Sequence, residues 1–216
     1  MIENSWLFVC EGTKTEPNYI NNLIKRINQI AKPERKINAV IKGKGKNTIS
    51  LVNTMDLFMD YVDEEYDKMH IPYSNIGVIF DKDSFGKEQF NTAIQKTKAM
   101  EKRLVLGGRV IPAWSNESFE LWLNLHFSYI PTNLNRNALN NALTKKFGST
   151  GVIGKRETYE RYGKSRLNLF DDIKRSGGSL TVAIKNSKRL AEEYDGEDYA
   201  NHSPCTNVYE LVLSSP

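Results

Sequence analysis

The sequence predicts an α/β fold, a mostly parallel sheet of about four strands flanked by helices. Two observations favour this class. Over the first two-thirds of the chain, short apolar runs alternate with longer segments whose apolar residues recur at helical spacing. Acidic or turn-forming residues directly follow several of the short runs, as they do at the ends of buried strands. The resulting β-α-β-α order makes neighbouring strands parallel.

Four short runs are the expected strands. The first three are the apolar runs at residues 6–10, 36–41 and 76–80. The fourth, at residues 109–114, is expected at an edge of the sheet, because Pro112 has no backbone N–H to donate to a neighbour.

Helical segments connect these strands. Pro17 suits the first turn of a helix that follows the first strand. Asn47 or Thr48 can cap a second helix, and helical spacing returns between residues 86 and 105. A fourth helix is expected over residues 117–127.

The start of that fourth helix carries a candidate site pair. Ser115 and Asn116 are suitable capping residues. If Asn116 caps the helix, Glu120 lies one turn beyond it, so the two side chains share a face.

The charge pattern divides the chain into a domain of residues 1–130 and a mainly helical, basic C-terminal region of residues 131–216. Residues 144–190 contain twelve Lys or Arg against four Asp or Glu, a local balance of +8. The remainder carries −4. Such a split indicates either a surface for an anionic partner or a solvated basic face without a partner.

Several classes of protein are excluded by composition. The longest apolar runs are far shorter than a membrane span, and the first residues do not resemble a secretory signal. Cys10 and Cys205 are too few for a disulfide framework or a zinc cluster. We therefore expect a cytoplasmic protein with no membrane contact.

Acidic residues follow the expected strands. Glu11 follows the first, and Asp81 and Asp83 follow the third. Glu16 and Glu120 lie a short distance further along their connections. Carboxyl ends of parallel strands meet at one edge, and a group of carboxylates there suits Mg²⁺ or Mn²⁺. Such a site supports metal-assisted phosphodiester cleavage. A lone Asp-x-Asp pair, by contrast, also occurs in turns and helix caps.

The same residues carry a family resemblance. The Glu-Gly pair and the later Asp-x-Asp resemble the catalytic signature of Toprim domains. Nearly the whole chain also resembles the RloB-like family. The segments that carry this second resemblance are CEGTKTEPNY at 10–19, FDKD at 80–83, SNESFELWL at 115–123 with His126, and SPCTNV at 203–208.

The resemblance implies a Toprim-like (Rossmann-like) fold and a role in bacterial anti-phage defence beside an AAA-type ATPase. By similarity to Toprim nucleases, Glu11 is the general acid or base, while Asp81 and Asp83 hold the metal. Similarity to OLD-type nucleases adds Glu16 and Glu120 for a second metal. The candidate catalytic residues are thus Glu11, Asp81, Asp83 and Glu120, and the candidate metal ligands are these four with Glu16.

Three further residues are expected to support the site. They are Gly12 in the first motif, Asn116, and His126, which is either a second group at the site or a packed histidine. Glu117 departs from the family pattern, which has Pro at this place.

Six basic residues are candidates for contact with nucleic acid. They are Lys44, Lys46, Arg156, Arg161, Lys164 and Arg166. Tyr159 and Tyr162 lie between the last four of these, and Phe170 follows them, as expected where backbone contacts combine with stacking on unpaired bases. A surface for an acidic partner protein is the alternative.

Together these expectations describe a Mg²⁺-dependent nuclease, acting on DNA or on RNA such as tRNA, that works with an ATPase partner. The alternative is a Toprim-like module that docks on the ATPase and has no catalysis of its own. A primase or topoisomerase is disfavoured, because no large additional domain is present. The sequence leaves a homo-oligomer open.

Overall fold

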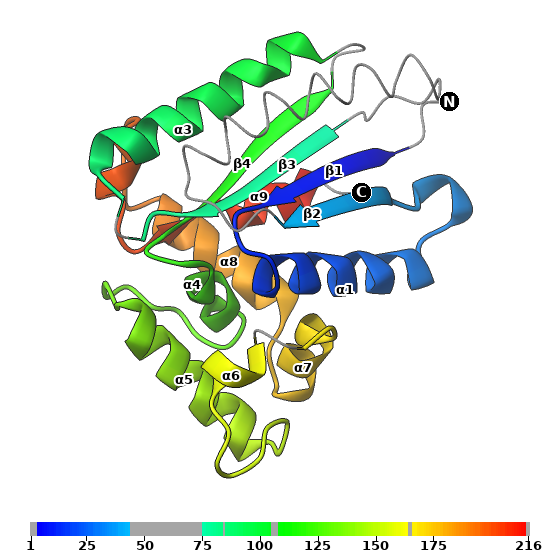
Figure 1. The fold of residues 1–216 in the computed structure, drawn as a ribbon, viewed down its shortest axis with the longest axis vertical. Helices are drawn as coiled ribbons and strands as arrows, with labels where there is room; N and C mark the ends of the chain where they lie inside the picture. Colours follow the sequence, from blue (N-terminus) through cyan, green and yellow to red (C-terminus); the bar gives the residue numbers. More distant parts are fainter. Residues whose placement is uncertain (1–3, 44–74, 84, 105–107, 164–165, 215–216) are drawn as a thin grey trace.

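The computed structural model describes residues 4–43, 75–83, 85–104, 108–163 and 166–214. It confirms the mixed α/β class, with a mostly parallel sheet of five strands in the order β2-β1-β3-β4-β5 (Figure 1). Lys44, Lys46, Lys164 and the helix expected after residues 47–48 lie outside the described residues.

The strands match the expected runs closely. They are β1 (Ser5–Cys10), β2 (Asn38–Gly43), β3 (Asn75–Asp81), β4 (Arg109–Asn116) and β5 (Cys205–Thr206). The pairs β1–β2, β1–β3 and β3–β4 are parallel, and β5 is antiparallel to β4. The sequence did not predict β5, because two residues are too short to show a strand pattern.

Helices connect and cover the strands. The α-helices described are α1 (Thr15–Ile30), α3 (Lys87–Ala99), α4 (Phe119–Leu125), α5 (Arg136–Ser149), α6 (Tyr159–Gly163), α7 (Leu169–Arg175), α8 (Leu180–Ala191) and α9 (Val208–Ser214). Short 3₁₀ turns are η1 (Pro33–Arg35), η2 (Met100–Arg103) and η3 (Tyr199–Asn201). In the part of the chain that is described, no helix combines the length and apolar character needed to cross a membrane.

Both faces of the sheet are buried, which explains the continuous apolar runs. Successive side chains of a strand point to opposite faces. In β1, Trp6 and Phe8 belong to one cluster of buried side chains, and Leu7 and Val9 belong to another. Figure 1 shows α3 over one face of the sheet and α1 and α9 over the other.

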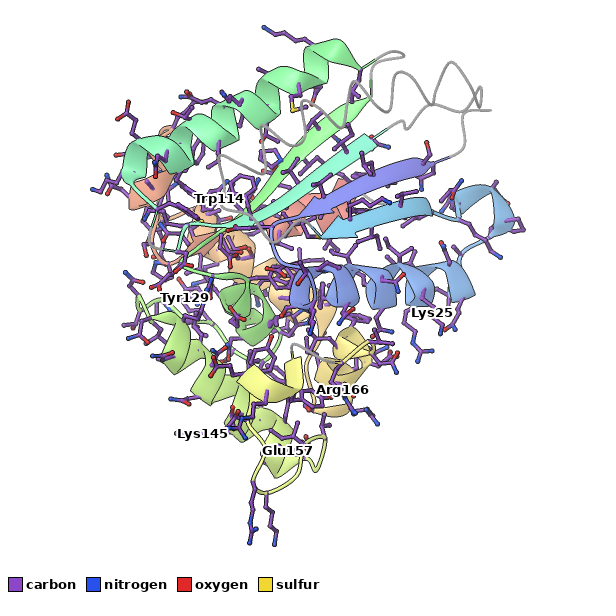
Figure 2. The ribbon with its side chains drawn as sticks, in the orientation of Figure 1. Lys25, Trp114, Tyr129, Lys145, Glu157 and Arg166 are labelled. Carbon is purple, nitrogen blue, oxygen red and sulfur yellow. The ribbon has the colours of Figure 1, made fainter. Side chains whose placement is uncertain are left out.

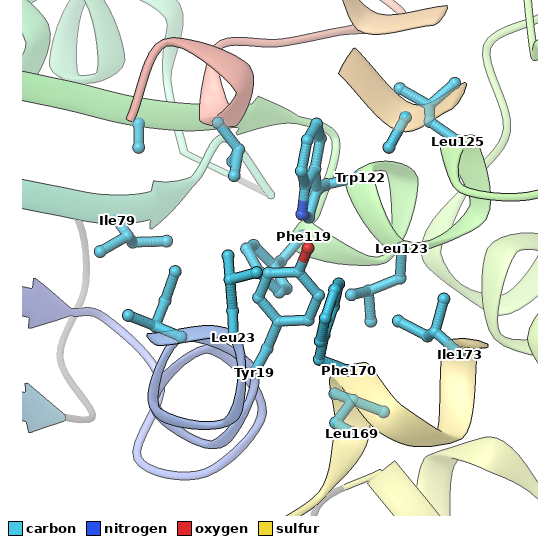
Figure 3. Packing of buried hydrophobic residues seen from close by; sticks show 14 of the residues in the cluster. Tyr19, Leu23, Ile79, Phe119, Trp122, Leu123, Leu125, Leu169, Phe170 and Ile173 are labelled. Carbon is cyan, nitrogen blue, oxygen red and sulfur yellow. The ribbon is translucent and has the colours of Figure 1, made fainter. Parts of the chain in front are cut away.

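The core on the α1 side continues beyond the sheet into the C-terminal helices. Tyr19 of α1 packs edge-on against Phe119 of α4 and Phe170 of α7, at centroid distances of 5.5 and 5.8 Å (Figure 3). Trp122 completes the group from α4 at 6.5 Å from Tyr19. One continuous cluster thus connects the sheet with the helices that follow it.

The structure corrects the expected start of α4. Ser115 and Asn116 were predicted to cap this helix, but they extend β4, where they pair with β5. The residue that precedes the helix is Ser118. The prediction that Asn116 and Glu120 share a helix face is therefore wrong, because Asn116 lies in a strand.

Pro112 lies in the part of β4 that pairs with β3 and does not pair with β5. The side chain of Asn207 donates to the Pro112 carbonyl at 3.1 Å. The expectation that this strand forms an edge of the sheet is therefore wrong, because β5 lies outside β4. Pro112 itself lies where β4 has no pairing with β5, so its missing N–H breaks no pairing there.

Candidate functional site

The carboxyl ends of β1 and β3 bring together the first two predicted site residues. The backbone N–H of Glu11 donates to the Ile79 carbonyl at 2.8 Å, which continues the pairing of the strands by one residue. The Glu11 carboxylate accepts a hydrogen bond from the backbone N–H of Asp81 at 2.9 Å. The side chain of Glu11 therefore lies over the end of β3.

Glu16 approaches this place from the first turn of α1, with an exposed fraction of only 7%. Its carboxylate lies against the backbone of Gly12. A Cβ atom on residue 12 would come within 2.0 Å of Glu16 Oε2. Gly12 therefore supports the site by leaving room for the Glu16 carboxylate.

Asp83 and Glu120 complete a group of five carboxylates, the acidic cluster of Glu11, Glu16, Asp81, Asp83 and Glu120. Asp83 lies two residues beyond β3 with a φ of 42°, and its backbone N–H donates to the Glu117 carbonyl at 2.9 Å. This left-handed conformation is uncommon outside glycine, and Asp is one of the residues that tolerate it. Glu120 lies in the first turn of α4.

Arg136, which the sequence analysis did not single out, lies among these carboxylates. Its guanidinium contacts Asp81 at 2.9 Å and Asp83 at 3.2 Å, and its Nε lies 3.9 Å from a Glu120 oxygen. Arg136 begins α5, directly after the capping residue Asn135. Nothing in the local sequence distinguishes it from the other basic residues of this region.

Burial and mutual repulsion raise the pKa values of the cluster. Burial raises the pKa of Glu11 to about 6, and the nearby charge of Asp83 adds to the effect. Burial raises the pKa of Glu16 to about 7, with further contributions from Glu120 and Glu11. The pKa of Asp81 is also raised, mainly by burial and then by Glu16 and Glu120, against the opposing charge of Arg136. Shifts of this kind are typical of functional sites.

A cavity of about 380 Å³ opens beside the cluster. One wall is the turn before α1, and the other comes from α5 and α6, which contribute Arg136, Asn140 and Tyr159. Glu16, Asp81 and Glu120 also line it. Three of the five predicted acidic residues therefore line a cavity, together with Arg136.

The donor set suits a hard divalent cation, because every acidic side chain offers oxygen and no thiol or imidazole takes part. As arranged, however, no group of three or more His, Cys, Asp or Glu within the described residues is positioned to hold a metal ion. In this arrangement the Arg136 guanidinium donates to oxygens of Asp81 and Asp83. A metal would need those oxygens.

The side chains of Asn116 and His126 make their hydrogen bonds with residues outside the acidic cluster. The side-chain amide of Asn116 donates to the Ala200 carbonyl at 3.0 Å. His126 is buried, with Nε2 2.9 Å from the Tyr19 hydroxyl, and burial lowers its pKa to about 3. Its surroundings are those of the packed histidine that the sequence analysis kept as an alternative.

The described basic candidates are Arg156, Arg161 and Arg166. All three are exposed. Arg166, labelled in Figure 2, pairs with Asp172 at 3.6 Å and lies over the Tyr162 ring. The three aromatic residues expected to stack on bases are buried: Tyr159, Tyr162 and Phe170. Their predicted stacking role is wrong, because they fill the core between α5, α6 and α7.

Comparison with known proteins gives a single family. The family described as RloB, RloB-like protein, matches residues 6–214. The match covers every described member of the acidic cluster as well as Arg136. No curated protein matches the chain. No solved structure matches it either.

Proposed function

The chain belongs to the RloB-like protein family, and from that premise we propose that it is a Mg²⁺- or Mn²⁺-dependent nuclease that cleaves nucleic-acid phosphodiesters. The observation that carries this proposal is the acidic cluster, in which five carboxylates come from three strand-to-helix connections and three of them, Glu16, Asp81 and Glu120, line one cavity.

A site of this composition favours a cation thermodynamically. Buried like charges raise the pKa values of Glu16 and Asp81, so ionising them together is unfavourable without positive charge nearby. Asp81, Asp83 and Glu120 offer oxygens that a divalent ion prefers. Such an ion, when bound, activates water as a nucleophile and stabilises the leaving oxygen.

Glu11 is suited to proton transfer. Because its pKa is about 6, both the protonated and the ionised form of Glu11 are populated near neutral pH. Its carboxylate is oriented by the Asp81 backbone N–H, which fixes one oxygen at 2.9 Å. The expectation from the Toprim resemblance, that Glu11 is the general acid or base, agrees with this environment.

The ATPase partner and the anti-phage role rest on the family resemblance. We propose that the chain is the effector of a defence system, with the ATPase controlling when the site meets its substrate. Arg156 and Arg161 are exposed on the C-terminal region, where we propose contact with nucleic acid or with such a partner.

A second function is favoured by one observation. Arg136 already neutralises part of the acidic cluster, as a structural ion pair would in a module without catalysis. In that case the chain docks on the ATPase and the cluster only maintains the fold.

Asp83→Asn separates the two functions. Asp83 is 39% exposed at its side chain, so the change leaves the core untouched. We expect the variant to lose at least about 100-fold in cleavage of labelled DNA or tRNA with Mn²⁺, since a metal ligand is removed. It should lose phage protection as well. Asp171→Asn, which changes a partly buried partner of Arg26 outside the acidic cluster, is the matched control and should keep both.

Phage protection by Asp83→Asn at the wild-type level would reject the nuclease and support the docking module. Cleavage by the purified variant at the wild-type rate would reject Asp83 as a ligand.

A further inference from the structure

The position of Arg136 indicates a mechanism that couples two ligands. On the premise of the proposed function, we propose that Arg136 is a built-in cation of the acidic cluster. When a divalent metal binds Asp81 and Asp83, the guanidinium of Arg136 releases these carboxylates and binds a phosphate of the nucleic acid instead. Metal and phosphate then bind cooperatively, because each favours the same position of one side chain.

The first support is the set of contacts that Arg136 makes. Its guanidinium donates to Asp81 Oδ2 at 2.9 Å and to Asp83 Oδ2 at 3.2 Å. Both residues are proposed metal ligands, so guanidinium and metal require the same oxygens. Two adjacent positive groups would also repel each other. Metal binding therefore requires Arg136 to leave.

The second support is that Arg136 has a place to move to. It lines the cavity of about 380 Å³ and its side chain is 38% exposed, so reorientation does not disrupt the core. Guanidinium groups bind phosphate with paired hydrogen bonds. A phosphate in this cavity would lie within reach of the same α5 turn.

The third support comes from a different residue of the cavity. Tyr159 has an exposed fraction of 2%, and its hydroxyl makes no hydrogen bond of ordinary geometry among the described residues, with the Thr15 side chain as its neighbour. A buried hydroxyl without a hydrogen bond of ordinary geometry lowers the stability of the fold, and such a group indicates a site for a polar ligand. Asn140 adds a second buried polar atom without a partner on the same wall.

The N-terminus of α1 faces the same space. Residues 13–16 line the cavity, and no side chain caps this sixteen-residue helix. The start of a helix attracts anions through its dipole and its N–H groups. The start of α1 on one wall and the Tyr159 hydroxyl beside Arg136 on the other provide groups that a phosphate in this cavity can contact.

Calorimetric titration tests the coupling. Mn²⁺ is titrated into wild type, Arg136→Gln and the control Arg26→Gln, each with and without thymidine 3′,5′-bisphosphate as the phosphate probe. Arg26 is also ion-paired with an aspartate, at 2.6 Å, but outside the site. In wild type and in the control, we expect the bisphosphate to tighten Mn²⁺ binding by at least about 5-fold, the lower end of ordinary coupling.

Arg136→Gln should bind Mn²⁺ alone more tightly than wild type, by about 5-fold or more, and should lose the coupling. Unchanged affinity and unchanged coupling in this variant would overturn the inference while leaving the metal site and the nuclease intact. The absence of Mn²⁺ binding in every protein, with or without the bisphosphate, would overturn the inference and the proposed metal site together.

Arg136→Lys covers the case in which the glutamine variant does not fold, as judged by its thermal unfolding. Lysine keeps the charge but cannot donate to two carboxylates in the paired geometry of arginine. Its Mn²⁺ affinity without the probe should exceed that of wild type. An affinity equal to or below wild type would contradict the competition between Arg136 and the metal.

Discussion

Glu16 is an acidic side chain that the fold has removed almost entirely from water. It lies beneath the turn at Gly12, where a Cβ would leave no room for its carboxylate. Burial, together with the charges of Glu120 and Glu11, raises its pKa to about 7. The folded protein thus holds Glu16 in a condition that opposes its ionisation, as expected for a residue kept for function rather than for stability.

Glu16 should make the metal-free protein less stable as the pH rises. Its pKa is about 7 when folded against an ordinary value of 4.5, so the folded state binds more protons between these limits. The contribution is therefore full below about pH 4.5 and is lost as the pH rises through about 7. We expect Glu16→Gln to raise the free energy of unfolding at pH 8 by up to about 3 kcal/mol, measured with urea in the presence of a chelator.

Glu34→Gln is the matched control, because Glu34 is exposed in η1. It should leave the pH dependence of stability unchanged. If Glu16→Gln instead shows the wild-type slope between pH 5 and 8, the buried carboxylate is not the origin of that slope.

The residues of the candidate site differ in how far the sequence could predict them. Glu11, Asp81 and Asp83 follow apolar strands, and strand ends meet at one edge of a parallel sheet, so their meeting is predictable. Arg136 reaches Asp81 across 55 positions of sequence. Its arrival depends on how α5 packs, and this cannot be deduced from local spacing.

Elements pack closely where a strand carries no side chain. Gly77 lies in β3 on the side of the sheet that α9 covers. A Cβ on it would come within 2.5 Å of Leu211 of α9 and 2.9 Å of the Phe8 ring. The absence of a side chain at Gly77 therefore allows α9 to lie directly on the sheet.

Gly77→Ala should destabilise the protein by about 1–3 kcal/mol through overpacking, measured as a lower urea midpoint with an unchanged m-value. Gly148→Ala is the control. It lies in α5, where a Cβ meets nothing within 4 Å, and should stabilise by about 0.5–1 kcal/mol. Equal stability of Gly77→Ala and wild type would show that α9 does not sit on β3 this closely in solution.

Among the elements, the bounds of the central strands were predicted from the sequence to within about two residues, because burial on both faces gives these strands continuous apolar runs. The prediction failed at the end of β4. Ser115 and Asn116 have the composition of a helix cap, but Ser115 pairs with Asp81 of β3 and both residues pair with β5, which keeps them in the strand. A distant pairing overrides a local preference here.

The molecule as a whole joins its two ends in one core. β5 adds to the sheet beside β4, and Val208 and Leu211 of α9 are buried in the same cluster as Trp6 and Phe8 of β1. Asp171 of α7 also pairs with Arg26 of α1 at 2.6 Å. The basic C-terminal region therefore covers apolar surface that the first 130 residues would otherwise expose.

This arrangement predicts that residues 1–130 do not fold by themselves. Without α5, α7 and α9, the fragment exposes Tyr19 and Trp122, which are buried in the full chain. It also exposes the part of the sheet that Leu211 of α9 covers. Burial of apolar surface is the main term that offsets the entropy of folding. We expect the fragment to bind a hydrophobic dye and to unfold without a cooperative transition, whereas the full chain shows a single one.

A cooperative transition of the fragment, with slow amide exchange in β1 and β3, would show instead that the acidic cluster is built on an independent domain. Arg136 would then be a contribution from a separate unit, and its coupling of metal and phosphate would depend on how that unit docks.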